Sequence, residues 1–203
     1  MKIIKKIAPS DLENILTSKE YMEDGGMVIS SLNYIDENLI VTFNLFINNE
    51  KKNQWELKIL KIADERFIRG WAQNFTAYSD HFLLYAFTDV FTDLYYNGKS
   101  TKPDKLLLDL YKSHLNNYYY DFPFTYGINE AMNVFKLCKD NSGMFARGSR
   151  KILMNYQECL AKHGIQSNFV GEIPCINKNL NLLVFGESYF IGEKFIFNKT
   201  LDY

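Results

Sequence analysis

The sequence has few cysteines, and their spacing argues against two structural roles of this residue. Cys138, Cys159 and Cys175 are an odd number, and no pair of them has the Cys-x-x-Cys spacing. A disulfide framework normally uses an even number of cysteines, and a structural zinc site uses closely spaced pairs. We therefore expect a reducing compartment, no disulfide framework and no metal site.

The sequence also lacks long apolar runs, repeats and linker-like segments. No stretch approaches the roughly 18 apolar residues that a membrane span needs, and the first residues contain no apolar run typical of a secretory signal. We expect a cytoplasmic protein that does not bind a membrane. Since no Pro- or Ser-rich linker interrupts the chain, we predict a single domain over residues 1–203.

Basic residues are absent from one long part of the chain. The formal net charge is −1, so no basic excess indicates a nucleic-acid partner. Residues 1–98 contain 10 Lys/Arg and 14 Asp/Glu, whereas residues 99–203 contain 13 and 10. No Lys or Arg lies between Gly70 and Gly98. This asymmetry is compatible with chance, and it is also what a surface for a basic partner requires.

No motif in the sequence indicates catalysis, and we predict no catalytic residue and no cofactor. There is no Gly-x-Ser-x-Gly elbow, and no cysteine has the surroundings of a known nucleophile. The three histidines, His81, His114 and His163, each fit a structural role better than a catalytic one. Arg147 and Arg150 flank a helix start where an anion would bind, but we prefer an ordinary helix start at Ser149.

Period-two patterns dominate the first part of the chain. After a helix over Pro9–Lys19, in which Ser10 and Glu13 have capping-box spacing, β-branched and aromatic residues alternate with polar ones. We predict a four-stranded antiparallel meander because the connections are short. Its expected strands are Met27–Tyr34, Leu39–Ile47, the run around Trp55–Ile59, and Phe67–Phe75.

Helical periodicity begins after residue 98. Apolar residues recur at three and four positions from Pro103 to Tyr118, which predicts a long amphipathic helix. Further expected elements are helices over Asn129–Cys138 and Ser149–His163, a loop at 140–143, and strands at Gln166–Val170, Leu180–Phe185 and Phe190–Phe197. The fold class is therefore α+β: an N-terminal antiparallel β-meander continues into a mixed sheet, covered by two or three C-terminal helices.

The stretch Tyr78–Gly98 connects these two parts. It is rich in Phe and Tyr and carries three aspartates and no Lys or Arg. Its β-branched and aromatic content favours two strands, His81–Phe87 and Phe91–Tyr96, although an apolar run of this length also suits a helix.

Three segments together resemble a known group of proteins: DHFLLYAFTDVFTDLYYNG, LLLDLYKSHL and GMFARGSRKILMNYQECLAKHGI. Over residues 78–164 their layout is similar to that of uncharacterised small bacterial proteins that look like immunity proteins of polymorphic or contact-dependent toxin systems. The sequence departs from that pattern at Phe82, where the group has Pro, and at Arg147–Ser149, where it has Gly-Pro. The resemblance implies a cognate protein toxin as the partner and supplies no catalytic residues.

We accordingly expect a non-catalytic cytoplasmic immunity protein that neutralises a basic toxin, with a nuclease as the expected class, through an acidic, Tyr-rich surface. The candidate partner-binding residues are Tyr78, Asp80, Tyr85, Asp89, Asp93, Tyr95 and Tyr96. Two alternatives stay open. One is a small-molecule or enzymatic pocket near Tyr118–Phe124, lined by His114, Tyr119, Phe122 and Arg147. The other is a structural or scaffolding role.

Overall fold

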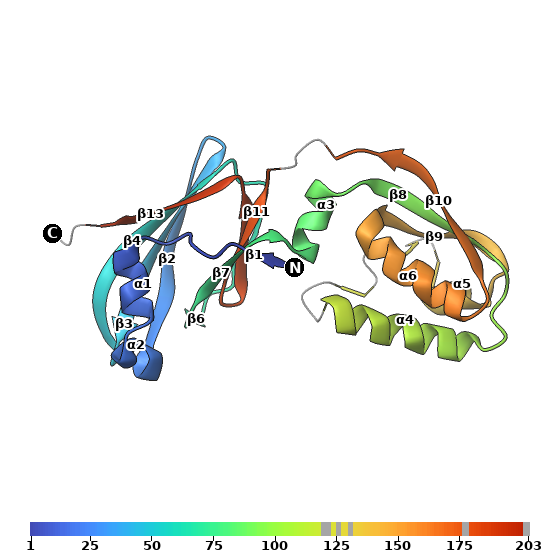
Figure 1. Cartoon of the computed structure of the whole chain (residues 1–203), viewed down its shortest axis with the longest axis horizontal. Helices are drawn as coiled ribbons and strands as arrows, with labels where there is room; N and C mark the ends of the chain where they lie inside the picture. The colour runs from blue at the N-terminus through green and yellow to red at the C-terminus, as the bar shows by residue number, and fades with distance from the viewer. Residues whose placement is uncertain (119–122, 125–126, 130–131, 176–178, 201–203) are drawn as a thin grey trace. The chain divides into compact units, whose positions relative to one another are not determined.

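The structure, a computed structural model, consists of two compact units (Figure 1). It describes residues 1–118, 123–124, 127–129, 132–175 and 179–200. Unit 1 comprises Met1–Leu84 and Asn179–Tyr203, and unit 2 comprises Tyr85–Lys178. The chain therefore leaves unit 1 once and returns to it. The single domain expected over residues 1–203 stays a prediction.

Unit 1 contains two antiparallel sheets, of strand order β1-β7-β11-β12-β5 and β13-β4-β3-β2-β6. Its elements are β1 (Lys2–Ile3), α1 (Ser10–Leu16), α2 (Lys19–Asp24), β2 (Gly25–Ile35), β3 (Asn38–Ile47), β4 (Glu50–Leu60), β5 (Asp64–Arg66), β6 (Trp71–Ala72), β7 (Phe75–Asp80), the 3-10 helix η1 (Phe82–Leu84), β11 (Asn181–Phe185), β12 (Ser188–Gly192) and β13 (Lys194–Lys199).

The first three strands of the predicted meander are confirmed. Leu39, Val41 and Phe43 are fully buried, so the period-two pattern of β3 identified its inward face correctly. Asn48 and Asn49 have positive φ values of 54° and 62° and form the tight turn between β3 and β4. The predicted fourth strand, Phe67–Phe75, is wrong. The neighbour of β4 on its other side is β13, and the segment contributes only β6 and the first residue of β7.

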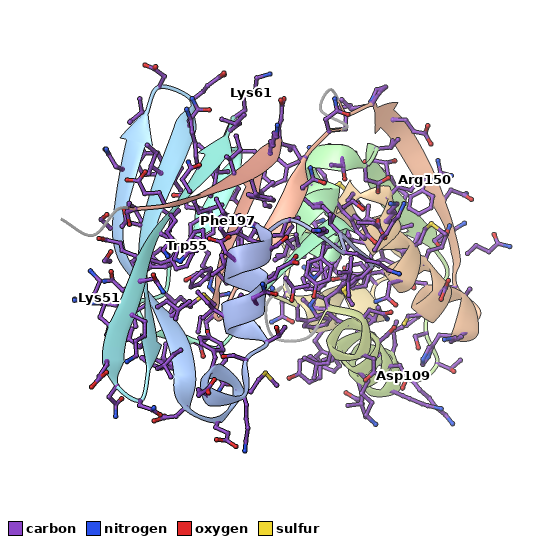
Figure 2. All side chains as sticks on the ribbon, turned by 60° about the vertical axis from the view of Figure 1, so that its left-hand side comes forward. Lys51, Trp55, Lys61, Asp109, Arg150 and Phe197 are labelled. Carbon is purple, nitrogen blue, oxygen red and sulfur yellow. The ribbon has the colours of Figure 1, made fainter. Side chains whose placement is uncertain are left out.

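The core of unit 1 lies between its two sheets. The ring centroids of Phe43 and Phe185 are 5.4 Å apart, and those of Phe75 and Phe197 are 5.0 Å apart. Each of these two contacts joins a strand of one sheet to a strand of the other. Figure 2 shows Trp55 and Phe197 inside the unit and Lys51 and Lys61 at its outside. The apolar faces of the strands are thus buried against one another, which is the main favourable contribution to stability.

The N-terminal helix differs from the prediction in two ways. The segment forms two short helices, α1 and α2, and Pro9 occupies the N-cap position of α1 without a side-chain hydrogen bond. The capping box predicted for Ser10 and Glu13 is therefore wrong. The side chain of Ser18 instead caps α2 by accepting a hydrogen bond from the Tyr21 N–H (3.3 Å).

Unit 2 contains a three-stranded antiparallel sheet, of order β10-β8-β9, with helices on one face (Figure 1). Its elements are α3 (Tyr85–Thr88), β8 (Phe91–Asn97), α4 (Pro103–Tyr118), α5 (Val134–Lys139), β9 (Ser142–Ser149), α6 (Arg150–Lys162) and β10 (Gln166–Ile173). Helix α6 packs on all three strands, and α4 packs on α6 and α5.

In unit 2 the long elements agree with the prediction and some short ones do not. Helices α4 and α6 and the strand at Gln166–Val170 are confirmed, as is the strand Leu180–Phe185 of unit 1. The single strand predicted over Phe190–Phe197, also in unit 1, is wrong, because this segment forms β12 and β13, which belong to different sheets. The predicted strand His81–Phe87 is wrong, because this segment forms η1 and α3, with the Leu84 N–H donating to the His81 carbonyl (2.9 Å). Of the loop predicted at 140–143, the first two residues lie between α5 and β9, and the last two begin β9. Helix α5 is shorter than the helix expected over Asn129–Cys138.

The α+β class is confirmed, and most helical residues lie in the later part of the chain. The strands expected to continue one mixed sheet are divided among three sheets, in which the pairs between named strands are antiparallel. Among the described residues, no helix combines the length and apolar character of a membrane span.

Candidate functional site

The seven candidate partner-binding residues are divided between the two units. Tyr78 and Asp80 belong to unit 1, and the other five belong to unit 2. The Tyr78 ring packs on His81 with 4.9 Å between ring centroids. A carboxylate oxygen of Asp80 lies 3.5 Å from the N-terminal amino group of Met1. Both residues are half-buried and are engaged within their own unit.

Asp89 completes the start of helix α6. Its carboxylate accepts hydrogen bonds from the Ser149 hydroxyl (2.5 Å) and from the backbone N–H of Lys151 (2.7 Å). Ser149 occupies the N-cap position, as the sequence predicts, but its own side chain does not cap the helix. The first turn of a helix has unpaired N–H groups and a partial positive charge, which a carboxylate satisfies. The anion considered at this helix start is therefore supplied by the protein itself.

Asp93 on β8 forms a two-point ion pair with Arg147 on β9. The Arg147 Nε donates to Oδ1 at 2.5 Å and Nη2 donates to Oδ2 at 2.8 Å. These two residues are direct cross-strand partners, which sets the geometry. The hydrogen bond from Arg147 lowers the pKa of Asp93 below its ordinary value of 3.8. The negative charge of Asp93 is consequently compensated within unit 2.

We predict a favourable coupling between these side chains at neutral pH, because the two-point geometry fixes both partners, although solvent weakens the attraction between exposed charges. Asp93→Asn, Arg147→Gln and the double variant, compared by chemical unfolding, measure it. The folded-state pKa of Asp93 is lowered, so the contribution is fully present above pH 3.8 and is lost as the pH falls through the lowered value. A coupling of zero at neutral pH would contradict this interpretation.

The tyrosines of the stretch have different environments. Tyr96 is buried, and its hydroxyl donates to the Leu137 carbonyl (3.0 Å), so it is not available to a partner. Burial raises the pKa of Tyr96 to about 12. Tyr85 is half-buried, with the Lys151 ammonium 4.5 Å from its ring centroid. Tyr95 is the exposed one of the three.

Tyr95 belongs to an exposed apolar surface, which we call the β8–β10 face. It is the side of the sheet opposite α6, since Thr92, Leu94 and Tyr96 are buried and the alternate residues of β8 are not. Four large apolar side chains lie on it: Phe91 (40% exposed), Tyr95 (41%), Val170 (52%) and Ile173 (67%). In the strand register, Ile173 is opposite Phe91 and Val170 is opposite Asp93, so the Asp93–Arg147 pair lies among the apolar residues.

A β-bulge places the two apolar residues of β10 on the same face. The register shifts between Val170 and Glu172, and the intervening Gly171 has a φ of 70°. In a regular strand, residues three apart point to opposite faces, and the extra residue of a bulge removes this alternation. The Thr92 hydroxyl donates to the Gly171 carbonyl (2.5 Å) and stabilises the bulge. Val170 and Ile173 thus both point outward.

The alternative pocket residues do not converge where the structure describes them. Tyr119 and Phe122 lie outside the described residues. His114 is fully buried on α4, and its Nδ1 is 3.1 Å from the Tyr156 hydroxyl. Burial raises the pKa of Tyr156 above its ordinary value. Arg147 lies instead on the β8–β10 face with Asp93. His114 is therefore a core residue, as its position on the helix predicts.

His163 and the three cysteines are buried or half-buried. His163 Nε2 lies 2.9 Å from an Asp109 carboxylate oxygen. Cys138 and Cys159 are buried in helices, and burial raises the pKa of the Cys138 thiol to about 11. Cys175 is half-buried near the Phe87 carbonyl. Among the described residues, no group of three or more His, Cys, Asp or Glu side chains is arranged to hold a metal ion.

Of these residues on the β8–β10 face, the sequence analysis named Asp93 and Tyr95 as candidates and did not name Phe91, Val170 and Ile173. The alternation of β8 was readable, and it places Phe91, Asp93 and Tyr95 on one face. The bulge in β10 was not readable with the same certainty, although Gly171 between Val170 and Glu172 is a signal for one.

No family model matches this chain, and no curated protein or solved structure matches it significantly.

Proposed function

We propose that this protein is a non-catalytic, cytoplasmic immunity protein, and that unit 2 binds a cognate protein toxin through the β8–β10 face. The observation that carries the proposal is the group of four large apolar side chains exposed on two neighbouring strands around one arginine. Aromatic and arginine side chains are enriched at protein interfaces and contribute most of their binding energy.

The proposed contact is mainly apolar. Asp89 and Asp93 have partners within unit 2, so neither offers an uncompensated charge to a basic toxin. Unit 2 as a whole contains 11 Lys/Arg and 9 Asp/Glu. Apolar burial is only weakly sensitive to ionic strength, whereas attraction between exposed charges is screened by salt. The toxin should therefore stay bound at high salt.

The test is an affinity pull-down from a lysate of the source organism with low-salt and high-salt washes. We expect one protein to be retained at both salt concentrations by the wild type and to be lost with Ile173→Asp. Met154→Asp is the matched control, because Met154 is exposed on α6, on the other side of the sheet. The purified partner should kill cells, and equimolar protein should suppress the killing.

Three results would contradict the proposal. Loss of the partner at high salt would favour binding through charged side chains over the apolar face. Equal retention by Ile173→Asp and the wild type would place the contact elsewhere. Suppression of the toxin at amounts far below equimolar would indicate catalysis in place of binding.

A further inference from the structure

Strand β2 of unit 1 has an unpaired edge. Along one side it pairs with β3 over its whole length, whereas on the other side β6 pairs only with Met27 and Val28. Over 29–35, no strand of the described part of the chain covers this second side. Alternate backbone N–H and C=O groups of an edge strand point away from the sheet and are available to another strand.

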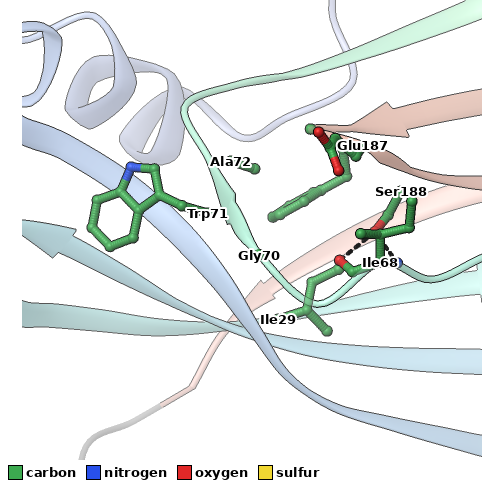
Figure 3. A pocket seen from close by; sticks show the side chains of 9 residues that line it. Ile29, Ile68, Gly70, Trp71, Ala72, Glu187 and Ser188 are labelled. Atoms are coloured by element: carbon green, nitrogen blue, oxygen red, sulfur yellow. Dashed lines mark hydrogen bonds between the residues drawn. The ribbon is translucent and has the colours of Figure 1, made fainter.

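The segment that would cover this edge is held away from it. The hydroxyl of the buried Ser188, on β12, accepts a hydrogen bond from the Ile68 N–H (3.0 Å) and lies 3.1 Å from the Ile68 carbonyl oxygen (Figure 3). The backbone of Ile68 is thus satisfied by Ser188 and does not pair with β2. The chain pairs with the edge only at Trp71 and Ala72, among the described residues. The Trp71 indole lies over Gly26, and a Cβ at Gly26 would be 2.0 Å from this ring.

Two cavities open where the chain leaves the edge. One, of about 560 Å³, lies between β2 and the residues Phe67 and Arg69. The other, of about 210 Å³, lies between Trp71 and the turn from β11 to β12 (Figure 3). Ile29 lines both. The larger cavity runs along the unpaired edge, so we call it the β2-edge groove.

The β2-edge groove has a distinct chemistry. Val28, Ile29, Leu32 and Phe67 supply apolar walls, and Arg69 is the one charged residue among those that line it. Arg69 is exposed, and it forms no ion pair with any described residue. An unpaired guanidinium beside an apolar groove favours an occupant that carries a carboxylate.

The sequence of β2 lacks the charged residues and prolines that protect many edge strands from pairing. Native edge strands are commonly shielded by lysines, prolines or inward-pointing charges. The β2 sequence GGMVISSLNYI contains no charged residue and no proline, and a bulge at Ser30 is its one irregularity. A second copy of β2 would bring no carboxylate to Arg69. The occupant that fits is therefore a different strand with an acidic side chain.

We propose that the β2 edge binds an extended segment of a partner protein as an additional antiparallel or parallel strand, with an Asp or Glu side chain of that segment on Arg69. Main-chain hydrogen bonds to residues 29–35 supply affinity, and the groove and Arg69 select the sequence. This site is in unit 1 and does not rest on the function proposed for unit 2.

The probe is a phage-displayed library of random octapeptides, selected on the full chain. We expect selected peptides to alternate apolar residues with Asp or Glu. For a synthetic peptide from the selection, Arg69→Glu should weaken binding at least tenfold. Replacing the Asp or Glu of the peptide by Lys should restore binding to the Arg69→Glu variant. Arg66→Glu is the matched control for an added negative charge nearby, and it should change affinity less than threefold.

Two further measurements identify strand pairing. N-methylation of alternate peptide nitrogens should abolish binding for one set of positions and leave the other set unaffected, because only alternate N–H groups face β2. Hydrogen exchange should slow at residues 29–35 when the peptide binds. Selection without acidic residues, equal effects of both methylation sets, or protection confined to another segment would each overturn the proposal.

Discussion

Replacing Asp89 by alanine is expected to lower the free energy of unfolding of unit 2 by about 2–3 kcal/mol, because loss of a helix N-cap costs about 1 kcal/mol and an unpaired buried hydroxyl costs about 1–2 kcal/mol. The carboxylate accepts from the Lys151 N–H and from the Ser149 hydroxyl, and Ser149 is buried. The acidic-surface hypothesis predicts instead an effect on partner association with little loss of stability.

The two tryptophans allow the units to be followed separately. Trp55 and Trp71 both belong to unit 1, whereas the long helices α4 and α6 belong to unit 2. Tryptophan fluorescence therefore reports the unfolding of unit 1, and far-UV circular dichroism is weighted toward unit 2. If the units unfold independently, Asp89→Ala should shift the unfolding transition seen by circular dichroism and leave the transition seen by tryptophan fluorescence unchanged. Coincident transitions would support the single cooperative domain predicted from the sequence.

The matched control for Asp89 is Asp104→Ala. Asp104 is also an acidic residue in the first turn of a helix of unit 2, but it is exposed. We expect a change of less than about 0.5 kcal/mol there, as is usual for surface positions. If both alanine variants have the same stability, the hydrogen bonds of Asp89 do not stabilise α6 as we infer.

Replacing His114 by alanine is expected to destabilise unit 2 by about 3 kcal/mol, which is typical of a large-to-small change in a core. The imidazole is fully buried, and its ring centroid lies 5.2 Å from that of Tyr118 and 5.5 Å from that of Phe124. The variant also removes the contact between Nδ1 and the buried Tyr156 hydroxyl. A residue that lined an open ligand pocket would show a smaller loss of stability.

Circular dichroism during chemical unfolding measures this effect, with Leu108→Ala as the control. Leu108 is on the same helix and is 47% exposed. Its truncation should cost less than about 0.5 kcal/mol. If His114→Ala is as stable as Leu108→Ala, the result would support the alternative of a pocket near Tyr118–Phe124.

The elements that the sequence predicted well are those with a long, regular pattern. Strand β3 alternates over ten residues and α4 repeats its apolar positions over sixteen, so a single period fits each. Segment Phe82–Thr88 is short and apolar throughout, and no period distinguishes helix from strand. The surroundings of this segment decided that it is helical.

Pairing partners distant in the sequence were not predictable. The strand beside β4 is β13. Its residue Phe197 pairs with Leu57, although most of the sequence lies between these two residues. The nearer candidate, Phe67–Phe75, has a similar apolar content. Neither segment carries a local signal of its neighbour, because strand pairing depends on loop closure and on the whole sheet.

By itself the sequence determined the α+β class, the meander of β2 to β4, the helices α4 and α6, and the presence of Asp89 and Asp93 in a stretch without basic residues. Only the tertiary structure decided what those carboxylates contact: Asp89 binds the start of α6 and Asp93 binds Arg147. The reason is that periodicity encodes which face of an element is buried, whereas the partner of a charge depends on elements more than fifty residues away.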